Sequence, residues 1–149
     1  KLAEAEAFYK SLENSLTKKH LILDLRDNPG GGKRNSDILL KILKKYLKKN
    51  SVYVLTNHNM ASNGEHFTMK ITKLSDRCVT FGDRTNGTAA YEVKNSIFTL
   101  PCKKYVAVLT SKKHKKYLPI ESQGITPLVY LDYERSWIEQ VQEYIAKGF

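Results

Sequence analysis

A serine at the start of a predicted helix has the residue type and the placement to do chemistry. Ser62 lies between the apolar run 51–55 and a segment in which apolar residues recur at helical spacing, a pattern typical of a strand, a turn and a helix. The unpaired N–H groups and partial positive charge at a helix start stabilise an oxygen that becomes negatively charged. Ser62 and Glu65 also have the spacing of an ordinary capping box. This stretch alone therefore leaves both a nucleophile and a helix cap open.

A run of three glycines is the second candidate for chemistry. It ends the loop 27–32, which follows the apolar run 21–25. Successive glycines leave backbone amides open to a ligand because no Cβ atoms stand in the way. The amides of Gly30 or Gly31, with that of Asn63, could bracket an oxyanion. A phosphate cradle or a flexible turn would use the same glycines, but the loop lacks the lysine–hydroxyl pair of a phosphate-binding loop, which favours the oxyanion site.

The elements that must position these loops follow a strand–helix–strand pattern. Nearly continuous apolar runs, typical of strands buried in a parallel sheet, occupy residues 21–25, 52–55 and 78–81. Amphipathic helices are predicted at 1–18, 36–49 and 62–74. The order predicts an α/β fold with a mainly parallel, buried sheet and flanking helices. Because loops that leave parallel strands meet at one sheet edge, we expect the glycine loop and Ser62 to face each other.

The second half of the chain is predicted to leave this pattern. Segments 90–93 and 97–100 are expected to pair as a hairpin through Lys94 and Asn95. Short strands are predicted at 105–109 and 129–131, followed by a closing helix from Trp137. With 149 residues and no linker or repeat, residues 1–149 are expected to form a single domain.

Composition narrows the classes of function. The net charge of +10 comes mostly from lysines clustered at 41–49 and 103–116. A nucleic-acid binder usually mixes arginine and aromatics into such a patch, so we expect solvated surface instead, with some attraction to acidic partners. No apolar run approaches the roughly 20 residues of a membrane span. Cys78 and Cys102 lack metal-ligand spacing, so buried free thiols and no metal site are expected.

Several segments resemble the C-terminal-processing (tail-specific) serine peptidases. The sequence LILDLRDNPGGG at 21–32 is similar to the hallmark strand and glycine loop of that family. Further segments that agree in order and spacing are 52–65, 78–87, 90–100 and 124–127. The resemblance implies a Clp-protease/crotonase-like α/β fold, a polypeptide substrate and no metal or organic cofactor. It also implies a location in the bacterial cell envelope, where these peptidases usually work.

The same resemblance implies roles for individual residues. It makes Ser62 the nucleophile, and it makes Asn63 and the loop 29–31 the sources of the oxyanion-hole amides. The commoner branch of the family has a general-base lysine where this chain has Thr88. The tricorn-like branch uses a histidine and a glutamate, and Glu121 is similar to that glutamate. We therefore expect a serine endopeptidase core of the tricorn-like kind, whose histidine lies upstream in a longer protein. As a fragment it is expected to be inactive.

Two alternatives stay open at this point. His66 follows Ser62 by four residues, but a capping serine and its i+4 neighbour seldom align for proton transfer over roughly 2.6–3.2 Å. All four histidines are therefore expected to be exposed or held in hydrogen-bond networks, and Glu121 has an ordinary polar loop residue as its alternative. The absent lysine also supports a non-catalytic module that binds peptides or apolar ligands on the same fold. The sequence specifies neither the oligomeric state nor the substrate sequence.

Overall fold

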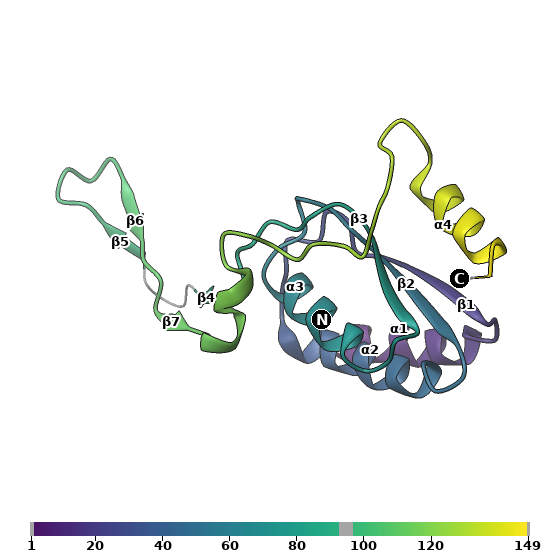
Figure 1. The fold of residues 1–149 in the computed structure, drawn as a ribbon. Coiled ribbons are helices and arrows are strands. Elements are labelled where there is room, and N and C mark those ends of the chain that lie inside the picture. The colour runs from purple at the N-terminus through teal and green to yellow at the C-terminus, as the bar shows by residue number, and fades with distance from the viewer. Residues whose placement is uncertain (1, 93–96, 149) are drawn as a thin grey trace.

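A four-stranded parallel sheet forms the centre of the computed structural model, which describes residues 2–92 and 97–148 (Figure 1). The strands, in spatial order, are β1 (His20–Asp24), β2 (Ser51–Thr56), β3 (Cys78–Gly82) and β8 (Val129–Tyr130). Leu21 of β1 pairs with Val52 of β2, and Val54 pairs with Thr80 of β3. The structure thus confirms a mixed α/β fold with a parallel sheet.

Helices cover both faces of this sheet (Figure 1). Their bounds are Leu2–Ser15 (α1), Lys33–Tyr46 (α2), Asn63–Thr72 (α3) and Trp137–Ala146 (α4). Val52 and Val54 of β2 belong to the core shared with α1, α2 and α3. Tyr53 and Leu55 belong to the core shared with α4. Alternate side chains of a strand point to opposite faces, so burial on both sides explains the continuous apolar sequence of β2.

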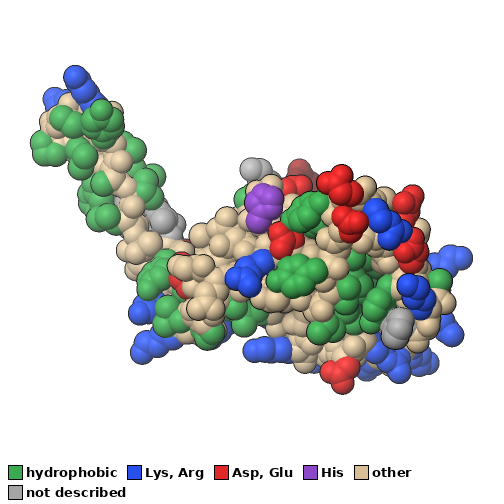
Figure 2. Space-filling view, turned by 45° about the horizontal axis from the view of Figure 1, so that its top comes forward, with side chains coloured by type: hydrophobic (Ala, Val, Ile, Leu, Met, Phe, Trp, Pro, Cys, Tyr) green, Lys and Arg blue, Asp and Glu red, His purple; other side chains and the backbone are tan. Residues whose placement is uncertain are grey.

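The remaining strands form an arm that projects from the body (Figure 1). They are β4 (Tyr91–Glu92), β5 (Ile97–Thr99), β6 (Val106–Val108) and β7 (Lys112–Lys113), and a 3₁₀ helix, η1 (Lys115–Ile120), leads back from it. We call residues 91–92 and 97–113 the arm. Figure 2 shows apolar side chains along it, and Phe98 is 55% exposed. An isolated two-stranded ribbon buries little surface, so this part of the fold depends least on the core.

The predicted hairpin between 90–93 and 97–100 is wrong in its pairing. Strand β4 pairs with β7, and β5 pairs with β6, both antiparallel. The turn of the ribbon follows β5, where Lys103 N–H donates to the carbonyl of Leu100 over 2.8 Å. Pro101 takes the second position of this turn, which its fixed φ favours. Lys94 and Asn95, the predicted turn, lie outside the described residues.

The two cysteines occupy opposite environments. Both are free, Cys78 is buried at the start of β3, and Cys102 is exposed in the turn of the arm. Burial raises the pKa of the Cys78 thiol to about 12. The expectation of two buried thiols is therefore wrong for Cys102, because the turn that begins at Leu100 carries it into solvent.

A thiol reagent should separate these two cysteines. At about pH 8 the thiolate is the reactive form, so dithionitrobenzoate should modify Cys102 rapidly and Cys78 only after unfolding. The expected release is one equivalent of chromophore from the native chain and a second in denaturant. Cys102→Ser should abolish the rapid phase. Rapid modification of both thiols in the native chain would contradict the burial of Cys78.

Candidate functional site

Ser62 lies in a strained turn between β2 and α3. It is the residue that precedes the helix, with φ of 52° and ψ of −117°. A side chain at such a positive φ is uncommon and costs on the order of 1–3 kcal/mol, so surrounding contacts must hold it. Two contacts do so: Glu65 Oε2 accepts from Ser62 N–H over 3.1 Å, and the neighbouring Ala61 N–H donates to the carbonyl of Asn28 over 2.9 Å. Ser62 itself is exposed, so the strained turn presents its hydroxyl to solvent.

The glycine loop lies directly against this turn. Gly30 has a φ of 111°, and a Cβ atom there would stand 2.8 Å from Ser62 Cβ and 3.1 Å from Ser62 Oγ. Only glycine fits both the conformation and the space. The side chain of Asn57 links the turn after β2 to the glycine loop. It accepts from Asp27 N–H and donates to Asp27 Oδ1, each over 3.0 Å. The structure thus brings the triple-glycine loop and Ser62 together, as we expected from the parallel strands.

The three predicted oxyanion donors are not equivalent. Gly30 N–H donates to Asn28 Oδ1 over 2.8 Å and is therefore occupied. In the described part of the chain, the N–H groups of Gly31 and Asn63 donate to no protein atom. Asn63 is the first residue of α3, where backbone N–H groups have no partner within the helix. Gly31 and Asn63 are therefore the two amides open to a ligand beside Ser62.

A cleft of about 370 Å³ opens beside Ser62 and Asn63. Gly31 lines one side of it, and His66 and His114 also line it. A second cleft of about 220 Å³ also borders the glycine loop and Asn63 and is lined in part by the apolar side chains of Tyr9, Leu25, Leu39 and Phe67. The hydroxyl and the two open amides thus share a cavity with two imidazoles.

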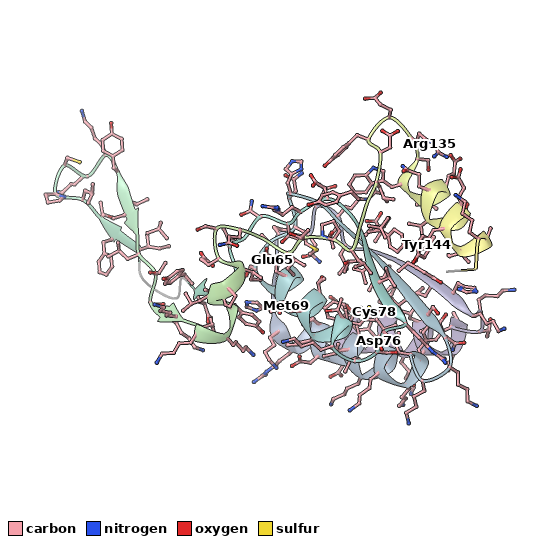
Figure 3. The ribbon with its side chains drawn as sticks, viewed as in Figure 1. Glu65, Met69, Asp76, Cys78, Arg135 and Tyr144 are labelled. Carbon is pink, nitrogen blue, oxygen red and sulfur yellow. The ribbon has the colours of Figure 1, made fainter. Side chains whose placement is uncertain are left out.

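Glu65 ties the serine turn to the loop after β3. Its side chain is fully buried at the start of α3 (Figure 3). Besides Ser62 N–H, its carboxylate accepts from Thr85 Oγ1 over 2.5 Å, from Gly87 N–H over 2.7 Å and from Thr88 N–H over 3.1 Å. Sequence analysis gave Glu65 only the role of a capping partner. Thr88 contributes its backbone N–H to this network. This is the position at which the commoner branch of the tail-specific peptidases, which the sequence resembles, has a lysine.

Glu121 does not reach Ser62 directly. Its Oε2 accepts from the N–H groups of Ala89 and Ala90, over 2.9 and 2.6 Å. The carbonyl of Ala89 in turn lies 2.7 Å from His66 Nε2. Glu121 is therefore connected to the cleft through one peptide group, while its predicted role of orienting an upstream histidine stays a prediction.

The histidines of the cleft are both held by partners. His66 stacks on Tyr117, with ring centroids 3.6 Å apart and an interplanar angle of 10°. Burial lowers the pKa of His66, while its hydrogen bond to the carbonyl of Ala89 acts in the opposite direction. His114 Nε2 lies 3.0 Å from Glu92 Oε2. Sequence analysis missed this second pair because the two residues meet only through the pairing of β4 with β7, and no local spacing signals that pairing.

Two further properties bear on the chemistry of the site. Among residues 2–92 and 97–148, no group of three or more His, Cys, Asp or Glu side chains is placed to hold a metal ion. Within the same residues, no helix has the length and apolar character needed to cross a bilayer.

Comparison with known proteins identifies similar structures rather than similar sequences. No protein-family model matches the chain, and no curated protein matches its sequence. A photosystem II D1 C-terminal processing protease is similar with a TM-score of 0.59 and 19% identity, over 87% of this chain and 38% of that one. The tricorn protease is similar with a TM-score of 0.66 and 19% identity, over 94% of this chain and 16% of that one. The chain thus has a fold found in two proteases and spans a minor part of either.

Removing the Glu65 carboxylate should destabilise the whole site. Glu65→Ala leaves the buried N–H of Gly87 and hydroxyl of Thr85 without an acceptor. Each such orphaned donor costs about 1–3 kcal/mol, so we expect the free energy of unfolding to fall by about 3 kcal/mol or more. Urea denaturation measures this change. Exposed Glu134 is the matched control, and Glu134→Ala should stay within about 0.5 kcal/mol of the parent. An equal loss in both variants would refute the role of Glu65.

Proposed function

We propose that this chain is the core of a serine endopeptidase in which Ser62 is the nucleophile. The observation that carries the proposal is the backbone of Ser62, held at a φ of 52° with its side chain exposed between β2 and α3. Strained strand-to-helix turns expose the nucleophilic serine of other hydrolases in the same manner. A capping serine needs no such strain, because an ordinary helix cap adopts a relaxed β-region backbone.

The backbone around Ser62 supplies the second requirement of acyl transfer. The open N–H groups of Gly31 and Asn63 would donate to the oxyanion that forms when Ser62 Oγ bonds to a peptide carbonyl carbon. The positive end of α3 adds to this stabilisation. The Ser62 proton passes to a base and then to the leaving amine as the C–N bond breaks, and water hydrolyses the ester that remains.

The similar structures support a peptidase, and the finer assignment below is a proposal from the sequence. Both are proteases by name, and the fold agrees over most of this chain. We assign the chain a Clp-protease/crotonase-like fold and place it with the tail-specific peptidases, closer to the tricorn-like branch because Thr88 replaces the lysine. A polypeptide substrate and a location in the bacterial cell envelope belong to the same proposal.

A fluorophosphonate probe tests the nucleophile. The probe should label the chain on Ser62, and Ser62→Ala should remove the label because the activated hydroxyl is gone. Ser11, which lies exposed on α1, provides the control, and Ser11→Ala should label like the parent. Mass spectrometry of the labelled peptide identifies the site. A folded protein that takes no label even in a longer form that would supply the expected upstream histidine would favour the alternative, a module that binds peptides without cleaving them.

A further inference from the structure

We propose that His66 is the base that accepts the proton of Ser62, held in place by the carbonyl of Ala89. This inference rests on the proposed function, because a base is needed only if Ser62 is a nucleophile. It differs from the expectation of an upstream histidine, since it completes the nucleophile and its base within one chain.

The placement of His66 puts it in the same cleft as Ser62. Its backbone N–H donates to the carbonyl of Ser62 over 3.0 Å, so the two residues are one helical turn apart. Side chains on a helix lean toward its N-terminus, which for α3 is the end that carries Ser62. Both side chains line the same cleft as the open amides of Gly31 and Asn63.

The tautomer of His66 leaves a basic nitrogen free. A carbonyl oxygen only accepts hydrogen bonds, so Nε2 of the neutral ring donates to Ala89 over 2.7 Å. The lone pair of the neutral imidazole is then on Nδ1. In the described part of the chain, Nδ1 forms no hydrogen bond with protein. A base requires this combination, one nitrogen anchored by its proton and the other open to receive one.

The support around His66 fixes the plane of its ring. Tyr117 stacks against one face at 3.6 Å, and Glu121 holds the Ala89 peptide through the N–H groups of Ala89 and Ala90. In a serine triad a carboxylate orients the histidine directly. In this chain the carbonyl of Ala89 does so, and Glu121 is a positioning residue that acts through that peptide.

The surroundings of His66 keep it neutral near pH 7. Burial lowers its pKa below the usual 6.5, and the charges of His114, Lys70 and Lys116 lower it further, against the hydrogen bond to Ala89. Above this lowered pKa the ring is unprotonated and able to accept a proton. The rate of reaction at Ser62 should therefore stay constant from neutral pH down to below pH 6.5 and fall only at lower pH.

The test is the rate of fluorophosphonate labelling of the chain. His66→Gln retains an N–H donor for the Ala89 carbonyl but has no basic nitrogen, so labelling should slow by about a hundredfold or more. The fall in the labelling rate at low pH should also disappear. His58, which is exposed and lies outside the lining of the cleft, is the matched control, and His58→Gln should label within about twofold of the parent. Imidazole in the buffer should partly restore labelling to His66→Ala, provided circular dichroism shows that the variant is folded.

The possible outcomes separate this inference from the proposed function. Loss of label in Ser62→Ala with an unchanged rate in His66→Gln would overturn His66 as the base and leave the nucleophile standing. A slow His114→Gln beside a normal His66→Gln would instead assign the base to His114. Undiminished labelling of Ser62→Ala would remove the proposed function itself.

The positioning role of Glu121 has its own readout. Glu121→Ala should slow labelling and shift the pH midpoint, because the Ala89 carbonyl loses its fixed position. Glu121→Gln keeps an oxygen that accepts from the same two N–H groups and should restore both the rate and the midpoint. A rate and midpoint unchanged in Glu121→Ala would contradict this role.

Discussion

The buried carboxylate of Glu65 is the interaction on which the site depends. It joins the turn of Ser62, at the start of α3, to the loop at Thr85–Thr88, which is also held there by the hydrogen bond from Asn86 N–H to the carbonyl of Met60. The Glu65 carboxylate is the acceptor in each of its own hydrogen bonds, since a carboxylate only accepts. Because the side chain is fully buried, no water could replace a donor that is lost, and the carboxylate would keep an unsatisfied acceptor.

A second constraint is the adjacency of β1 and β2. Since these strands are parallel neighbours, the loops that leave them emerge at one edge of the sheet. Gly30 completes the contact, because its missing side chain lets the backbone approach Ser62 Oγ. The two open amides beside Ser62 and the carbonyl of Ala89 belong to the backbone, which is present whatever the side chains. A fold of this kind tolerates extensive sequence change, which agrees with similar structures at 19% identity.

The parts of the fold that short stretches of sequence determine could be predicted. Continuous apolar runs identified β1, β2 and β3, and turn chemistry placed Ser62 and the glycine loop at their ends. The pairing predicted for the arm was wrong, because the described turn runs from Leu100 to Lys103 and joins β5 to β6. The network of Glu65 and the link from Glu121 to His66 escaped prediction, since they join residues from 20 to 32 positions apart through loops without periodicity.

The arm has a dynamic consequence. Its strands β5 and β6 hold each other by backbone hydrogen bonds, while the side chains of Ile97, Phe98, Val106 and Val108 face solvent. Opening the ribbon therefore disturbs no core, whereas opening β2 disrupts both cores of the body. Amide hydrogens of the arm should exchange with deuterium through a local opening, and those of β2 only when the whole body unfolds. We therefore expect the ribbon to open at a much lower free-energy cost than the body needs to unfold.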